Sequence, residues 1–232
     1  MSTLGTALAL GFILGIKHAL DADHVVAVST IVSRDPRPLR SALAGMFWGI
    51  GHTLTLFVAG IVVLFFKVNI PDRVALSFEF LVGAVLVALG AQNLWDYGRT
   101  RFHTHSHESG DTHVHYHAHK KGHDHHLTNR QRKSLLVGMM HGLAGSGALV
   151  LLILGTIESP LEGAAYILIF GLGSILGMMM IGTAMALPFS LSARKFGKLT
   201  KHIQLLAGGV SVFLGALVMV QIGLLGGLLA AA

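Results

Sequence analysis

Long apolar blocks, rather than an alternation of apolar and polar residues, dominate this sequence and constrain its fold most strongly. A hydrocarbon core about 30 Å thick needs roughly 20 mostly apolar residues in each helix that crosses it. Six blocks meet that length, and charge or proline separates each from the next; they cover residues 4–32, 41–66, 75–96, 135–157, 163–188 and 203–229. The pattern predicts an all-α polytopic membrane protein with six transmembrane helices.

Composition supports this class and excludes several others. Of the 232 residues, 53% are hydrophobic and only 12% are charged, whereas a soluble domain usually has about 25% charged residues. The net charge of +6 does not indicate nucleic-acid binding, because the basic residues punctuate apolar segments instead of forming a stripe. The absence of cysteine excludes a disulfide framework, an iron–sulfur cluster and a cysteine zinc site. We therefore expect the lipid bilayer as a partner and no nucleic acid.

The distribution of lysine and arginine predicts the orientation. Fourteen of these 17 residues lie in the loops after the first, third and fifth spans, two (Lys67 and Arg73) lie on the opposite side, and Lys17 lies within the first span. Cytoplasmic loops carry the excess of basic residues. We therefore expect these three loops in the cytoplasm, both termini outside and the chain in the cell (inner) membrane. The first span lacks the basic leader of a cleavable signal, so we expect it to be retained.

A repeat relates the first three spans to the last three. The letters GIKH at 15–18 recur as GMMH at 138–141, GIGH at 49–52 as GLGS at 171–174, and the segment at 80–91 recurs at 205–216. Because each half has three spans, the second half enters the membrane from the opposite side. The alternative is that segments rich in Gly, Leu, Val and Ala resemble one another by composition.

We interpret the pattern as a 3+3 inverted repeat, an architecture typical of secondary transporters, whose sites lie near the midplane between the halves. The expected organisation is a first three-helix repeat at 1–98, a histidine-rich cytoplasmic loop at 99–134 and a second three-helix repeat at 135–232.

Ionisable residues gather near the middle of the first span: Lys17, His18, Asp21, Asp23 and His24. Such groups are costly in hydrocarbon unless they are paired or hydrated, so they indicate a functional site. On a continuous helix His18, Asp21 and His24 lie within an arc of about 120°, and imidazole with carboxylate suits a divalent transition metal. On such a helix Asp23 would point away from Asp21 and would act as a partner of a metal ligand. In an unwound segment, both carboxylates could converge on the metal. A Lys17–Asp21 ion pair, four residues apart, is the structural alternative.

The second and fourth spans each carry one histidine. His52 follows Gly49 and Gly51, small residues that permit close helix approach. We expect His52 to be a metal ligand, although a lone histidine on an apolar helix is more often a packing residue. His141, the repeat mate of His18, is expected to be a closing ligand or a neighbour of the site. Ser174, the repeat mate of His52, is expected to be a packing hydroxyl.

The loop between the halves carries ten further histidines. They are His103, His105, His107, His113, His115, His117, His119, His123, His125 and His126. Such a tract cannot form a core and is typical of a disordered, metal-binding segment. We expect it to buffer metal at the cytoplasmic mouth as an auxiliary site, not to form the permeation site.

Two motifs resemble those of the nickel/cobalt transporter (NiCoT) family. Residues 17–25, KHALDADHV, resemble that family's His-x4-Asp-His signature, and residues 47–53, FWGIGHT, resemble its glycine–histidine motif. The resemblance implies a membrane permease that imports Ni²⁺ or Co²⁺. It assigns the site to His18, Asp21, Asp23, His24 and His52. The usual family pattern has eight spans, so this chain is similar to the shorter, six-span branch of urease accessory nickel permeases.

The combined observations predict a permease that imports Ni²⁺, with Co²⁺ as a second substrate, and a functional link to a cytoplasmic nickel enzyme such as urease. No catalytic cofactor and no enzymatic activity are expected: a base-bearing metalloenzyme motif is absent, and Glu79 is the only glutamate within an expected span. A Walker-type nucleotide motif is absent too. An exporter of the same metals, and a membrane metal sensor built on the histidine loop, are the alternatives. Nitrogen and oxygen ligands do not distinguish Ni²⁺ from Co²⁺ or Zn²⁺.

Overall fold

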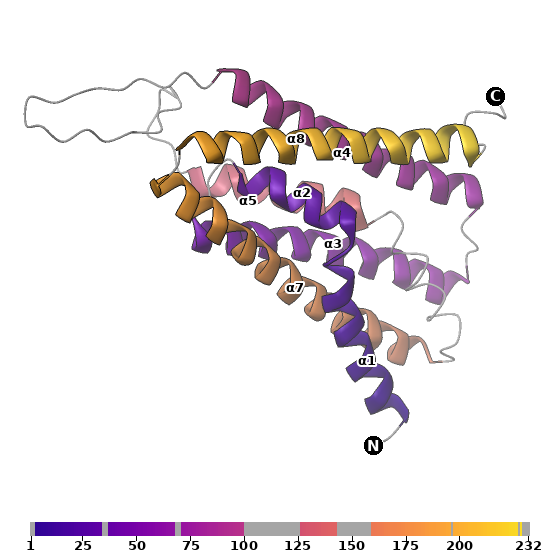
Figure 1. Ribbon diagram of the computed structural model, residues 1–232. Helices are drawn as coiled ribbons and strands as arrows, with labels where there is room; N and C mark the ends of the chain where they lie inside the picture. Colours follow the sequence, from indigo (N-terminus) through magenta and orange to yellow (C-terminus); the bar gives the residue numbers. More distant parts are fainter. Residues whose placement is uncertain are drawn as a thin grey trace, which may run out of the picture.

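Helices make up all the regular structure in the part of the chain that the computed structural model describes, which is residues 3–33, 37–67, 71–99, 126–142, 159–195, 197–226 and 228. Figure 1 shows their arrangement. The elements are α1 (Thr3–His18), α2 (Ala22–Val32), α3 (Pro38–Phe66), α4 (Asp72–Arg99), α5 (His126–Gly142), α7 (Pro160–Lys195), α8 (Gly197–Val220) and a π-helical turn, η1 (Gln221–Leu225).

Four of these helices are long and apolar enough to cross a membrane by themselves. They contain the candidate spans Pro38–Phe66, Asp72–Gly98, Pro160–Pro188 and His202–Leu225. Helices α1 and α2 pass the same test only together, as one broken span or a re-entrant loop. Large apolar side chains on the outside of these helices, such as Phe65, Leu168 and Phe213, are exposed, as lipid-facing residues must be. The chain is a multi-pass membrane protein.

The fourth expected span, 135–157, is described only in part. Helix α5 begins at His126, earlier than the expected boundary of the histidine-rich loop at 134, and it is described as far as Gly142. Arg132 and Lys133 are exposed on this helix, as is usual where a helix end projects beyond the hydrocarbon. Residues 143–158 lie outside the described residues, so this span stays a prediction.

The first span is not a continuous helix. Helix α1 ends at His18, and α2 begins at Ala22 at an angle of 54° to it. The amide of Leu20 donates to the carbonyl oxygen of Lys17, and that of Asp21 donates to the carbonyl oxygen of His18, so α1 closes in short turns. Asp21 is the N-cap residue of α2, with extended backbone angles (φ −61°, ψ 146°). The arc expected on a continuous helix is therefore wrong for this span.

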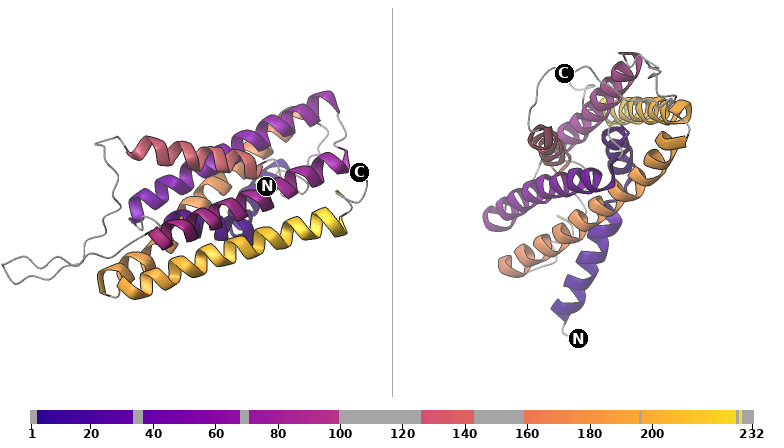
Figure 2. Two further views of the ribbon diagram at one scale, coloured as in Figure 1. Left: turned by 90° about the horizontal axis from the view of Figure 1, so that it is seen from above. Right: turned by 90° about the vertical axis from the view of Figure 1, so that its left-hand side faces the viewer.

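The helices form two packed groups with α2 between them. Helix α7 packs against α1 and α3, α3 also packs against α5, and α4 packs against α8. In Figures 1 and 2, α4 and α8 run side by side along one face of the molecule, and the N-terminal end of α1 projects away from the other helices. Helix α2 contacts α3 and α7 on one side and α4 and α8 on the other. His24, in the first turn of α2, is thereby buried inside the protein.

The main apolar core surrounds α2, which explains why a helix of only 11 residues holds its place. Its fully or almost fully buried members are Ala19, Ala27, Val28, Val32, Trp48, Val82, Leu86, Met178, Ile181 and Ala186. They come from α2 and its neighbours on both sides, so the core joins the two helix groups.

A buried amide cluster ties the C-terminal end of α2 to the α4–α8 pair. The side-chain amide of Asn93 donates to the backbone oxygen of Gln204 (3.2 Å), and the side-chain amide of Gln204 donates to Asn93 Oδ1 (3.3 Å). The hydroxyl of Ser33 also donates to Asn93 Oδ1, at 3.4 Å. Interhelical hydrogen bonds of this kind hold membrane helices together where hydrophobic burial cannot.

Helices α1 and α5 meet their partner helices in the same way. A Cβ atom added to Gly15 of α1 would collide with the carbonyl oxygen of Phe170 of α7, and one added to Gly138 of α5 would collide with that of Trp48 of α3. Gly138 follows Gly15 by 123 positions, and Phe170 follows Trp48 by 122. The two contacts therefore join residues that the sequence repeat aligns.

The same reciprocity holds for the glycines of the opposite helices. A Cβ atom on Gly173 of α7 would collide with the carbonyl oxygen of Phe12 of α1, and one on Gly51 of α3 would collide with that of Leu135 of α5. Gly173 follows Gly51 by 122 positions, and Leu135 follows Phe12 by 123. Small residues at such crossings let two backbones approach to contact distance, and here they do so twice with the same register.

The α4–α8 crossing has matched glycines as well. A Cβ atom on Gly83 would lie 2.9 Å from the carbonyl oxygen of Gly215, and one on Gly208 would lie 3.2 Å from that of Gly90. Gly208 and Gly215 follow Gly83 and Gly90 by 125 positions each. The α1–α7 and α5–α3 crossings thus have glycine contacts at matching positions of the sequence repeat, and the α4–α8 crossing has such contacts within one helix pair.

Candidate metal centre

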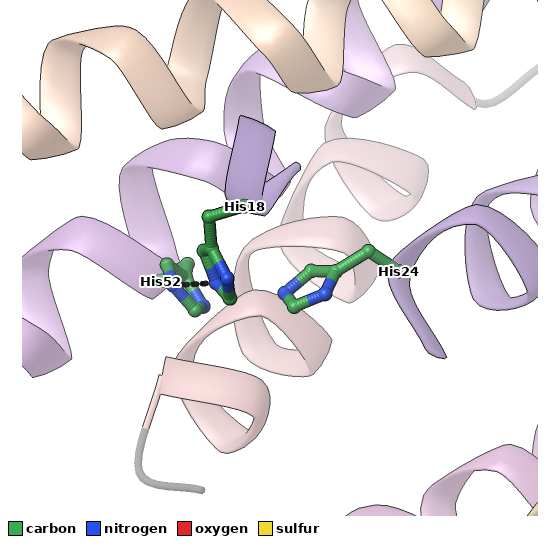
Figure 3. Close-up of side chains that lie close together, drawn as sticks. All are labelled: His18, His24 and His52. Carbon is green, nitrogen blue, oxygen red and sulfur yellow. Dashed lines mark hydrogen bonds between the residues drawn. The ribbon is translucent and has the colours of Figure 1, made fainter. Parts of the chain in front are cut away.

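Three histidines from three helical elements converge inside the protein. His18 is the last residue of α1, His24 lies in the first turn of α2 and His52 lies in the middle of α3. Their exposed fractions are 8%, 2% and 0%, respectively. Figure 3 shows the three rings pointing toward one another, with α5 passing beside them. The break after α1 brings His18 and His24 together, because it lets the chain turn between them.

The spacing of the three rings fits one metal ion. One ligand atom from each histidine lies within 4.8 Å of the others, and Nε2 of His18 is 3.2 Å from Nε2 of His52. Two nitrogens bound to one ion at about 2.1 Å lie roughly 3.0–3.4 Å apart. The ring centroids of His18 and His24 are 4.6 Å apart, and those of His24 and His52 are 5.3 Å apart.

Each of the first two histidines is held by an aspartate. Nδ1 of His18 lies 2.7 Å from Oδ2 of Asp21, and Nδ1 of His24 lies 3.0 Å from Oδ1 of Asp23. A histidine that donates its Nδ1 proton to a carboxylate keeps the Nε2 lone pair for a metal and has its ring orientation fixed. Both aspartates therefore lie at the site, and Asp23 does not point away from it as a continuous helix would require.

The aspartates also form a more open group of their own. Asp21, Asp23 and His24 offer ligand atoms within 4.8 Å of one another. The side chain of Asp21 is 53% exposed and that of Asp23 is 34% exposed. Lys17 is exposed, and within the described part of this region each aspartate pairs with a histidine rather than with the lysine. The Lys17–Asp21 ion pair is thus not the arrangement present.

His141 lies against the three-histidine group but outside it. The centroid of its ring is 5.4 Å from that of His24 and 5.0 Å from that of Trp48. Its side chain is 2% exposed, and neither ring nitrogen forms a hydrogen bond with another side chain among the described residues. Among the ten loop histidines, His126 begins α5, and the other nine lie outside the described residues.

The sequence interpretation missed two aromatic residues that line the site. The ring of His18 stacks on Phe170 (centroids 5.6 Å apart, rings inclined by 30°), and the ring of His141 packs on Trp48 at 5.0 Å. A usable signal exists, because both aromatic residues precede the repeated GIGH and GLGS segments. Extending the repeat alignment by one residue would have paired Trp48 with Phe170.

Ser174 occupies the position that corresponds to His52 in the second half. Its hydroxyl donates to the backbone oxygen of Gly15 at 3.2 Å, and the side chain is fully buried. This is a helix-packing contact between α7 and α1. The sequence repeat therefore aligns a buried hydroxyl at 174 with the buried imidazole at 52.

Known proteins resemble this chain over different extents. Residues 27–217 match the family described as the cytochrome C biogenesis protein transmembrane region. Urease accessory protein UreH of a Bacillus species is 43% identical over 225 residues, which cover 95% of this chain and 93% of that protein. The high-affinity nickel transport protein of Cupriavidus necator is 32% identical over 91 residues, which cover 38% of this chain and 24% of that protein.

A third relative is more distant. The Arabidopsis thaliana chloroplast protein FOR GROWTH AND FERTILITY 2 is 23% identical over 215 residues, which cover 91% of this chain and 55% of that protein. No solved structure matches the chain.

Proposed function

We propose that this chain, which belongs to the UreH branch of the nickel/cobalt transporter family, is a permease that moves Ni²⁺ across the membrane. Through residues 27–217 it also belongs to the family described as the cytochrome C biogenesis protein transmembrane region. The 232 residues contain no cysteine, so a role that depends on a thiol has no residue to perform it. The names of both nickel- and urease-related relatives support a transport role rather than a catalytic one.

The observation that carries the proposal is the convergence of three buried imidazoles, two of them held by aspartates. His18, His24 and His52 would replace most of the water around the ion, and Asp21 would supply a carboxylate oxygen and negative charge. Asp23 would orient His24. Lys17 is exposed near the bend and would adjust the local charge. Nickel and cobalt both accept this nitrogen and oxygen ligand set, so Co²⁺ would be a second substrate.

We further propose that six spans form a 3+3 inverted repeat around this site, with residues 1–98 and 135–232 as the two halves. The paired glycine contacts of α1 with α7 and of α5 with α3 support this arrangement. The excess of basic residues supports a cytoplasmic position for the loop at 99–134 and an external position for both termini.

Import is the direction we propose. A dication that moves inward gains about 4.6 kcal/mol per 100 mV of membrane potential, twice the value for a single charge, so uptake would need no nucleotide. The imported ion would serve a cytoplasmic nickel enzyme such as urease, a link suggested by the name of the 43%-identical relative.

Uptake of radioactive nickel by cells that lack other nickel importers tests the proposal. The parent chain should accumulate ⁶³Ni, and His18→Ala and His24→Ala should each reduce uptake by at least about tenfold. His202→Ala is the matched control, because His202 is exposed on α8, away from the site. Variants that accumulate nickel like the parent at equal membrane abundance would refute the site. Flux in vesicles of known sidedness separates an importer from an exporter.

A further inference from the structure

His141 is a buried metal-ligating side chain that the proposed three-histidine site does not use. Neither of its ring nitrogens forms a hydrogen bond with another side chain among the described residues. Buried polar groups in native proteins are rarely left unsatisfied, and those that are often serve a function. Nε2 of neighbouring His24 is also buried and without a partner. Neighbouring imidazoles on α2 and α5 therefore each keep a ring nitrogen that no other side chain partners.

The surroundings of His141 repeat those of His18 across the two halves. His141 follows His18 by 123 positions. His18 of α1 stacks on Phe170 of α7, and His141 of α5 packs on Trp48 of α3. Trp48 and Phe170 are themselves repeat mates, 122 positions apart. Each half thus places one imidazole on an aromatic ring of the other half.

His24 lies between these two imidazoles. Its ring centroid is 4.6 Å from that of His18 and 5.4 Å from that of His141, edge-on to both. Two imidazoles that bind one ion through bonds of about 2.1 Å have centroids roughly 4.5–5.5 Å apart. The His24–His141 pair meets this requirement as the His18–His24 pair does.

We propose that the ion occupies a second position, held by His24 and His141, after it leaves the His18–His24–His52 cluster. The inference rests on the proposed permease function and deepens it. Because Nε2 of His24 binds one ion at a time, the ion moves from one position to the other while His24 remains bound. An inverted repeat alternates access by moving one half against the other, and such a motion exchanges His18 for His141 as the partner of His24.

The second position differs chemically from the first. His18 and His24 are each held by an aspartate, whereas no carboxylate is paired with His141 among the described residues. The second position offers two imidazoles, with Asp23 still paired with His24, in place of three imidazoles and two carboxylates. It therefore binds Ni²⁺ more weakly than the first, which favours release after transfer. His141 is thus needed for transport but not for equilibrium binding.

Equilibrium binding of Ni²⁺ to the purified full chain and uptake of ⁶³Ni in cells, measured on the same variants, test this second position. His141→Ala should lower uptake by at least about tenfold and leave the Kd for Ni²⁺ within about threefold of the parent value. His18→Ala should raise the Kd by at least about tenfold as well as lower uptake. His202→Ala should change neither quantity.

Two replacements of His141 distinguish a role as a metal ligand from a role in packing. His141→Cys offers a thiolate, a strong ligand for transition metals, in a chain that otherwise has no cysteine, and should restore at least part of the uptake. His141→Phe fills the space without a ligand atom and should not. The Cys and Phe pair decides the question if His141→Ala fails to fold.

Several results would overturn the second position. They are uptake by His141→Phe equal to that of the parent, equal uptake by the Cys and Phe variants, or a Kd raised by His141→Ala as much as by His18→Ala. The last result would make His141 a ligand of the first position. Normal binding and uptake by His18→Ala would instead refute the proposed function, so the two failures are distinguishable.

Discussion

Helices α1 and α5 share a packing arrangement but differ in the chemistry they carry. Each meets its partner helix through a glycine that lies against a carbonyl oxygen, and each presents an imidazole to an aromatic ring. Helix α1 ends at a bend that holds two aspartates and a second histidine, whereas the sequence after His141 contains no aspartate or histidine from 142 to 157. The comparison teaches that the glycine contacts recur at both sets of repeated positions, whereas the aspartates paired with histidine occur at one of them.

The largest effects, on folding and stability, should come from substitutions at the glycines that lie against backbone oxygens of a neighbouring helix. Gly15→Leu and Gly138→Leu should each prevent correct packing, because the new side chain must occupy the space of a backbone oxygen. Overpacking typically costs about 1–3 kcal/mol, and more where the obstacle is backbone. Size-exclusion chromatography in detergent should show loss of the monodisperse protein for both.

Gly209→Leu is the control for this substitution, since a Cβ atom there meets nothing within 4 Å. It should elute like the parent. If the Gly138 variant were tolerated while the Gly15 variant were not, the two crossings would not be equivalent.

The next largest effect should be a difference in nickel uptake between substitutions at His52 and at Ser174, which align in the sequence repeat. His52→Ala should lower nickel uptake by at least about tenfold, because it removes the imidazole whose Nε2 lies 3.2 Å from that of His18. Ser174→Ala loses one hydrogen bond to the oxygen of Gly15, worth about 1 kcal/mol of stability, and should keep uptake within about twofold of the parent. Similar uptake by the two variants would contradict the assignment of the ligands to one half.

A smaller effect, a loss of affinity for Ni²⁺, should follow from neutralising either aspartate. Asp21→Asn and Asp23→Asn each weaken a carboxylate–histidine contact, of 2.7 Å and 3.0 Å respectively. Removal of such a partner typically lowers metal affinity by about 10–100-fold, and the amide, which still accepts a hydrogen bond, should place these variants near the lower end. Titration of the purified protein with Ni²⁺ measures the change. An affinity equal to that of the parent would mean that the histidines are oriented without the carboxylates.

The smallest effect on nickel uptake should come from a deletion in the histidine-rich loop at 99–134. Deletion of residues 103–125 removes nine of the ten loop histidines and should leave initial nickel uptake within about twofold of the parent, because the proposed permeation site lies in the helices. Uptake at low external nickel is the measurement. A loss as large as that of His52→Ala would assign the main function to the loop.

Much of the fold follows from the sequence because hydrocarbon admits few solutions. The expected spans at 41–66, 75–96, 163–188 and 203–229 each fall within or close to a candidate span of the structure. The bend at 19–21 was left open by the sequence, because KHALDADH has neither proline nor glycine to mark a break. It depends on tertiary contacts, since Ala19 is fully buried and lies against Gly177 of α7.

The residue types of the candidate site follow from the sequence, but their geometry does not. Charge inside an apolar span singles out His18, Asp21, Asp23 and His24, whatever the local backbone does. Which carboxylate pairs with which imidazole depends on the bend, and a continuous helix gives the wrong direction for Asp23. The aromatic partners of His18 and His141 come from other helices, so only the repeat alignment, and not the sequence around either histidine, indicates them.

The half-exposed carboxylate of Asp21 has a consequence for the bilayer around the protein. Its side chain is 53% exposed at the bend of a spanning segment, and an ionised group cannot remain in contact with acyl chains at that depth without solvation. Water or lipid headgroups must reach it, so the membrane is locally thinned or a hydrated funnel enters the protein there. In the proposed permease, an ion arriving by that route would begin to lose its hydration shell beside a negative charge and not against acyl chains.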